Sequence, residues 1–182
     1  MKKLLYSLSA LLISASTFAQ YEIKPVKGYS DNIGNMVAML DDLKSRVTSS
    51  VSNLNQKETD FLLDENANRI GAMIMHLAAT EVYYQKYTFE GRQFNEEENE
   101  KWGAALSLGD AGRENLVGKP ISYYLEIWDE VRAKTKELLK EKDDKWFAKK
   151  IGGMNNHWAW YHVMEHQANH MGQIRLILSR IN

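Results

Sequence analysis

The chain has 182 residues, of which 44% are hydrophobic, and its formal net charge is −1 at pH 7. This length fits one domain with a sizeable core, and a charge near zero argues against a surface dedicated to nucleic acids or anionic membranes. The chain contains no cysteine, which excludes disulfides, cysteine nucleophiles and lipidation of a cysteine.

The first 19 residues have the pattern of an export signal. Lys2 and Lys3 are followed by a mostly apolar stretch over 4–13, and Thr17-Phe18-Ala19 has the small-x-small form of a cleavage site. The apolar stretch is too short for a membrane span, which needs about 20 residues. We therefore expect a signal peptide over 1–19 and an exported domain over 20–182, located in a periplasm or secreted.

The exported part is predicted to be all-α, because its apolar residues recur at intervals of three or four and proline occurs only twice. Ser30, Asp31 and Asn32 can cap a first helix that runs to about Ser52. A second helix is expected to begin at Asp64 or Asn66 and to continue through about Tyr87.

A long connection over 89–118 separates the first two helices from the last two, with a short helix expected near 97–106. Pro120 leads into a third helix that ends at about Glu141, and the glycine pair 152–153 precedes a last helix over about 155–181. Four substantial helices with one long connection predict a four-helix bundle.

The most informative feature is a run of three histidines in the last helix, His162, His166 and His170. Residues four apart lie on one face of a helix, where two imidazoles can bind one metal ion. A helical wheel places Gln173 close to His166 and predicts that this face is also directed at the core.

The second helix offers a fourth histidine, His76, with Thr80, Tyr83 and Tyr87 on the same side of the wheel. If the second and fourth helices are neighbours, His76 can complete a three-histidine site with His166 and His170. Three neutral nitrogens with open positions suit zinc, nickel or iron(II). The alternative interpretation is a set of core histidines and tyrosines that only bond one another and pack.

Three segments resemble the DinB/YfiT-like superfamily: HVMEHQANHMGQI over 162–174, HLAATE over 76–81 and NHWAW over 156–160. The resemblance implies an up-down-down-up bundle with its long link between the second and third helices. It also implies a divalent metal bound by His76, His166 and His170, with His162 beside the ligands rather than among them. Members of this superfamily often form homodimers.

Some proteins of this superfamily transfer low-molecular-weight thiols, and others are metal-dependent isomerases or hydrolases. We therefore expect an exported metal-dependent enzyme of hydrolase or thiol-transferase type, whose metal activates water or a thiol toward a small molecule. Its pocket would be lined by His162, Tyr83, Tyr87, Thr80 and Gln173. The alternative is a bundle that binds a metal or ligand without catalysis.

Overall fold

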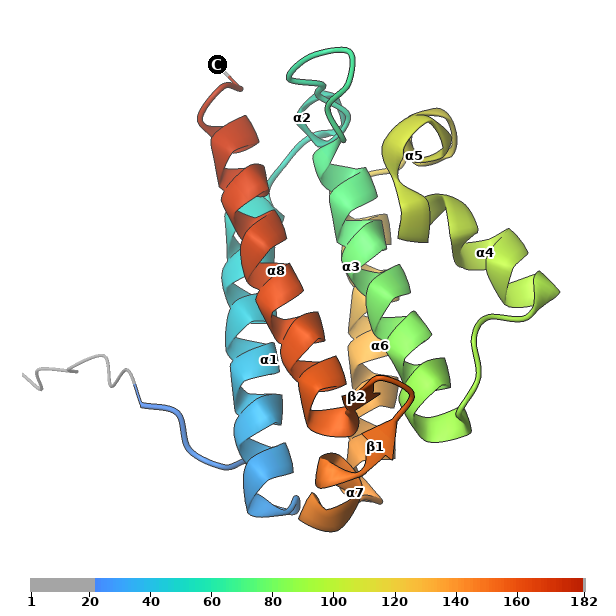
Figure 1. The fold of residues 1–182 in the computed structure, drawn as a ribbon. Coiled ribbons are helices and arrows are strands. Elements are labelled where there is room, and N and C mark those ends of the chain that lie inside the picture. Colours follow the sequence, from blue (N-terminus) through green and yellow to red (C-terminus); the bar gives the residue numbers. More distant parts are fainter. Residues whose placement is uncertain (1–21, 182) are drawn as a thin grey trace, which may run out of the picture.

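The computed structural model describes residues 22–181, so the expected signal peptide lies outside the described residues. Figure 1 shows four long helices side by side: α1 (Asp31–Val51), α3 (Ile70–Gln85), α6 (Ile121–Lys140) and α8 (Asn156–Leu178). The only strands in the described part are the two-residue β1 (Lys150–Ile151) and β2 (Met154–Asn155), which form an antiparallel hairpin. The all-α prediction is therefore confirmed, with a small hairpin at the predicted glycine break.

Shorter elements fill the connections: α2 (Gln56–Thr59), the π-helix η1 (Lys86–Glu90), α4 (Glu96–Ser107), α5 (Gly109–Asn115) and α7 (Asp144–Ala148). Of these, only α4 was predicted as a separate element. Both α2 and α4 begin with a capping box, in which the N-cap asparagine and the glutamate three residues later bond each other's backbone N–H.

The second long helix begins later than predicted, at Ile70 instead of Asp64 or Asn66. The preceding segment is a loop whose last residue, Arg69, donates from its side chain to the carbonyls of Asp60 and Arg113. The guanidinium thus joins this loop to the end of α5, and the chain enters α3 only after it.

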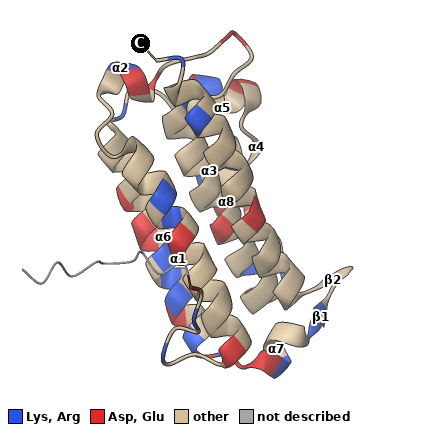
Figure 2. Ribbon diagram, turned by 90° about the vertical axis from the view of Figure 1, so that its left-hand side faces the viewer, with Lys and Arg blue, Asp and Glu red and all other residues tan. Residues whose placement is uncertain are grey.

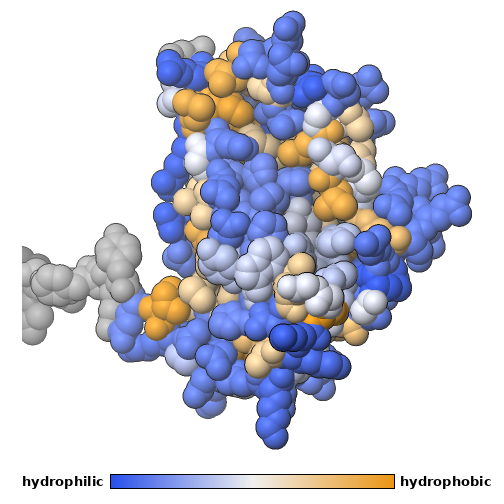
Figure 3. All heavy atoms as spheres, viewed as in Figure 1, coloured by the Kyte–Doolittle hydropathy of each residue, from blue (hydrophilic) through white to orange (hydrophobic). Residues whose placement is uncertain are grey.

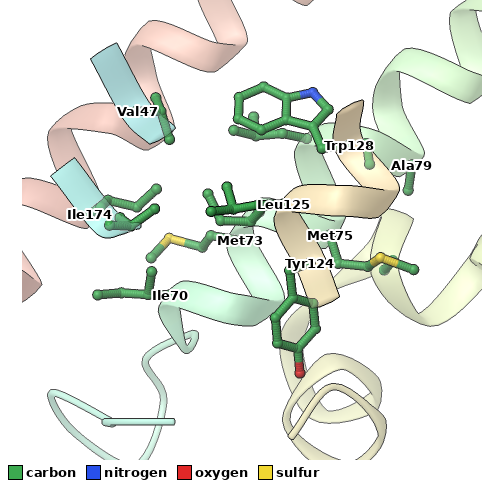
Figure 4. Close-up of a cluster of buried hydrophobic side chains, with 14 of the residues drawn as sticks. Val47, Ile70, Met73, Met75, Ala79, Tyr124, Leu125, Trp128 and Ile174 are labelled. Carbon is green, nitrogen blue, oxygen red and sulfur yellow. The ribbon is translucent and has the colours of Figure 1, made fainter. Parts of the chain in front are cut away.

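The core is centred on α3, which contacts α6, α8 and α4, while α1 packs against α8 and α6. Figure 4 shows Met73 of α3 between Leu125 of α6 and Ile174 of α8, all of them buried. α3 is buried along almost its whole length, because it has packing neighbours on three sides. A helix buried on three sides leaves little room for polar groups unless they are paired.

One such pairing lies within the bundle, around Glu81 of α3, whose side chain is fully buried. Arg132 of α6 donates from Nε and Nη2 to the two carboxylate oxygens at 2.8 and 3.0 Å. Trp128 and Thr135 donate to the same carboxylate at 3.2 and 2.6 Å. The network reaches Asp41 of α1 through Arg132, and Figure 2 shows acidic and basic residues interleaved along α1 and α6. Glu81 thus links α3 to α6 by charge as well as by packing.

Among the described residues, no helix combines the length and the apolar character that a membrane span requires.

Candidate metal centre

The histidine run of α8 lies at the edge of the core and not at its middle. His170 is buried, with 9% of its surface exposed, whereas His166 and His162 are half-buried and Gln173 is exposed. The prediction that the histidine face is the core face is therefore only partly right. The most buried residues of α8, such as Val163, Gln167 and Ile174, lie beyond His170 around the helix. The side of the run that bears His166 and His162 can therefore reach the surface.

The structure brings His76, His166 and His170 together across the contact between α3 and α8. His166 Nε2 lies 3.1 Å from His76 Nε2 and 3.0 Å from His170 Nε2. One ligand atom from each residue can be chosen so that all three lie within 4.8 Å of one another. This is the trio predicted from the sequence, and the three nitrogens converge on one small volume.

The hydrogen bond to α4 sets the orientation of His76. Its Nδ1 lies 2.8 Å from the carbonyl oxygen of Ala105, which can only accept, so Nδ1 carries the proton and Nε2 presents a lone pair. Metal-binding histidines characteristically donate their other ring nitrogen to a carbonyl or carboxylate in this way. α4 therefore positions an imidazole that it does not itself contribute.

The donor set fits a cation better than it fits three histidines alone. Because His76 Nε2 carries a lone pair, its short contact with His166 Nε2 needs a proton on the His166 atom. That one proton would also have to serve the contact with His170 Nε2, since a proton on His170 Nε2 would point at the N–H of His166. A divalent metal would accept all three Nε2 lone pairs at once and remove this conflict.

The environment also keeps the imidazoles in the neutral form that binds metals. Burial, together with the neighbouring histidines, lowers the pKa of His166 to about 3. Burial lowers the pKa of His170 to about 4, with His76 adding to the effect and Gln173 opposing it. Burial lowers the pKa of His76 as well, against its hydrogen bond to Ala105. All three are therefore neutral at pH 7.

His162 belongs to the site's surroundings and not to the converging trio. Its ring stacks between that of His166, at 5.8 Å, and that of Trp158, at 5.1 Å between centroids. Tyr84 of α3 meets its edge at 5.8 Å, and Glu165 accepts from its Nδ1 at 3.1 Å. A stacked column of Trp158, His162 and His166 thus runs along α8 from the trio toward the hairpin.

The other predicted pocket residues are distributed along α3 and α8. Thr80 lies one turn after His76, buried, with a hydroxyl that has no partner among the described residues. Tyr83 and Tyr87 stack on each other at 6.1 Å between centroids. Tyr84 contacts both Tyr83 and His162, and so connects this pair to the stacked column. Gln173 is exposed, although it is close enough to His170 to affect its pKa.

Three participants were missed by the sequence analysis: the carbonyl of Ala105, the ring of Tyr84 and the indole of Trp158. Neither Tyr84 nor Trp158 was assigned to the pocket from the sequence. Trp158 is in fact 46% exposed. The spacing of 158, 162 and 166 at four-residue intervals was the available signal for the column, whereas no sequence pattern marks a backbone carbonyl.

Comparisons with known proteins bear on this arrangement. A search of curated proteins gave no match. The family model described as mycothiol-S-transferase matches residues 35–181, which is most of the chain and includes all four residues His76, His162, His166 and His170. The match confirms the resemblance drawn from the sequence. The chain belongs to the mycothiol S-transferase family, within the DinB-like superfamily.

Proposed function

We propose that this protein is a metal-dependent thiol S-transferase, which joins a low-molecular-weight thiol such as mycothiol to a small electrophile. The observation that carries the proposal is the convergence of three neutral Nε2 atoms at the edge of the core, within a chain of this family. Because His166 and His162 are only half-buried, a small molecule can approach the trio from the surface.

His76, His166 and His170 would hold the divalent ion, for which zinc, nickel and iron are the candidates. A bound ion supplies a Lewis acid that favours the thiolate over the thiol. The Ala105 carbonyl fixes the orientation of His76, and Glu165 holds His162 beside His166, where its ring can orient a substrate. Of the predicted pocket residues, His162 is the best placed for that role.

The chemical change would be a displacement. The thiol loses its proton to solvent, sulfur forms a bond to the electrophilic carbon, and the leaving group departs with the electrons of the broken bond. The hydrolase alternative would use the same histidines with water in place of the thiol. The family match favours the thiol.

The proposal extends to organisation and location. We propose that the four long helices form the up-down-down-up bundle of the DinB-like superfamily; the contacts of α3 with α6 and α8 and of α1 with α8 support this. We also propose that residues 1–19 direct export of the domain over 20–182, and that the domain forms a homodimer.

The test is the conjugation of mycothiol to monochlorobimane by metal-loaded protein over 20–182, followed by fluorescence. Removing a residue that supports a metal ligand typically lowers activity about 10–100-fold. Removing a metal ligand itself should have a larger effect, so we expect the conjugation rate of His170→Ala to fall about 100-fold or more. His157→Ala is the matched control, because His157 is exposed and stacks on Phe147 away from the trio. A wild-type protein that binds metal but does not accelerate the reaction with any thiol would instead support the non-catalytic alternative.

A further inference from the structure

A hollow lies beside the hairpin and not over the histidines. Its volume is about 710 Å³, within the range of small-molecule sites, and its lining includes Lys150, Gly152, Met154, Asn155 and Trp158. We propose that this hollow binds a planar aromatic group carrying a negative charge, as the non-reacting part of the electrophilic substrate. Its role in catalysis rests on the proposed function, but its binding preference does not.

Trp158 is the feature that suggests an aromatic ligand. Its indole is 46% exposed and forms a wall shared by this hollow and a smaller one of about 280 Å³. Exposed tryptophans offer a large flat apolar surface on which a ring can stack. Figure 3 shows residues of intermediate hydropathy gathered on this face next to the hairpin, among more hydrophilic surroundings.

Trp158 also connects the hollow to the candidate metal centre. The indole of Trp158 stacks on His162, at an interplanar angle of 8°, and His162 stacks in turn on His166. Trp158 and His166 are eight residues apart on one helix, which is about 12 Å along its axis. A substrate with its ring on Trp158 would therefore need an extended arm to present its electrophilic carbon at the histidines.

The charge and shape of the lining restrict the class of ligand further. Lys150 is the one charged residue that lines this hollow, and it is exposed, so a ligand anion would meet a cation and no competing carboxylate among the lining residues. Met154 adds a flexible apolar side chain that can adapt to a ring. A Cβ built on Gly153 meets no atom within 4 Å, so this position of the lining opens into free space.

The hairpin that lines the hollow lies close to Tyr87 at Gly152. Gly152 has a φ of +55°, and a Cβ at this position would overlap the Tyr87 hydroxyl. Tyr87 lies in the π-helix η1, an irregularity often found at functional sites. Tyr87 thus occupies the space beside Gly152, and a side chain added at this position would have to displace it.

The experiment measures binding of two fluorescent probes to metal-free protein over 20–182, without thiol. The first is the anionic 1-anilinonaphthalene-8-sulfonate and the second is its neutral analogue N-phenyl-1-naphthylamine. Trp158→Ala should raise the Kd of both probes about tenfold, whereas Lys150→Met should raise only that of the anionic probe. Gly153→Leu, which adds a side chain to the lining without removing a contact, should weaken both.

Leu176→Ala is the control, because Leu176 is exposed on α8 but does not line the hollow. Unchanged Kd values in both Trp158→Ala and Gly153→Leu, or an equal loss in Leu176→Ala, would overturn the proposal. Trp158→Phe keeps a ring at this position and should retain most of the binding, so it tests the proposal even if Trp158→Ala does not fold. Neither metal nor thiol takes part in this binding measurement. Its result therefore does not depend on whether the S-transferase proposal is correct.

Discussion

Replacing Arg132 with methionine removes the main partner of the buried carboxylate of Glu81. Arg132 provides two of the four hydrogen bonds to that carboxylate, and its positive charge. Trp128 and Thr135 would still donate, but the charge would remain in a site with no solvent exposure. Breaking a buried ion pair in this way typically costs about 3–5 kcal/mol. In a domain of this size that corresponds to a fall in Tm of roughly 6–20 °C.

The assay is urea unfolding followed by circular dichroism, with the double variant Glu81→Leu/Arg132→Met beside the single one. Removing both charges leaves no unpaired ion, so the double variant should recover much of the loss. As a control, Lys134→Met removes an exposed ion pair with Glu137 and should change the free energy of unfolding by less than about 1 kcal/mol. A loss below about 1 kcal/mol in Arg132→Met would refute the claim that this network stabilises the contact between α3 and α6.

Two further predictions follow from the hairpin and from the histidines. Gly152→Ala should destabilise the protein by about 1–2 kcal/mol in urea unfolding, because of its positive φ and the overlap with Tyr87, whereas Gly153→Ala should change little; equal effects would contradict this. In the metal-free protein, burial is the main cause that lowers the pKa values of His166 and His170 to about 3 and 4. Below pH 6.5 the unfolded chain therefore binds more protons than the folded protein does. Stability should therefore fall as the pH decreases from about 6.5 to 4, and a His166→Ala/His170→Ala variant should show a smaller fall; an unchanged pH dependence would contradict the assignment.

The long helices could be predicted from the sequence because their signals are local. Ser30 precedes the first helix and Pro120 the third, and the structure begins α1 and α6 directly after them. The predicted capping bond from the Ser30 side chain is not formed, because its hydroxyl donates to Asp144 instead. The start of α3 was placed too early because the loop before Ile70 is stabilised by contacts of Arg69 with Asp60 and Arg113. Such contacts form only after distant segments have packed, and no local pattern reveals them.

In the candidate site, too, the features with a local signal could be predicted and those that depend on packing could not. The spacing of His162, His166 and His170 is a helical pattern and could be read directly, and pairing with His76 required only that two helices be neighbours. The position of the core was harder to predict, because a wheel built on the histidines does not show which side of them packs inward. Gln173 was consequently placed near the buried side, although it is exposed. The role of Glu81 was missed for a related reason: its partners are about 50 residues away in sequence.

The measurement that tests the central claim most directly is elemental analysis of untagged protein over 20–182, purified without chelator. The claim predicts about one equivalent of zinc, nickel or iron in the wild type and in His157→Ala, and its loss in His76→Ala and His166→Ala. Circular dichroism of each variant shows whether the loss reflects the ligand or the fold. A wild type that takes up no metal even on reconstitution, or a folded His166→Ala that retains a full equivalent, would contradict a metal centre built on these three histidines.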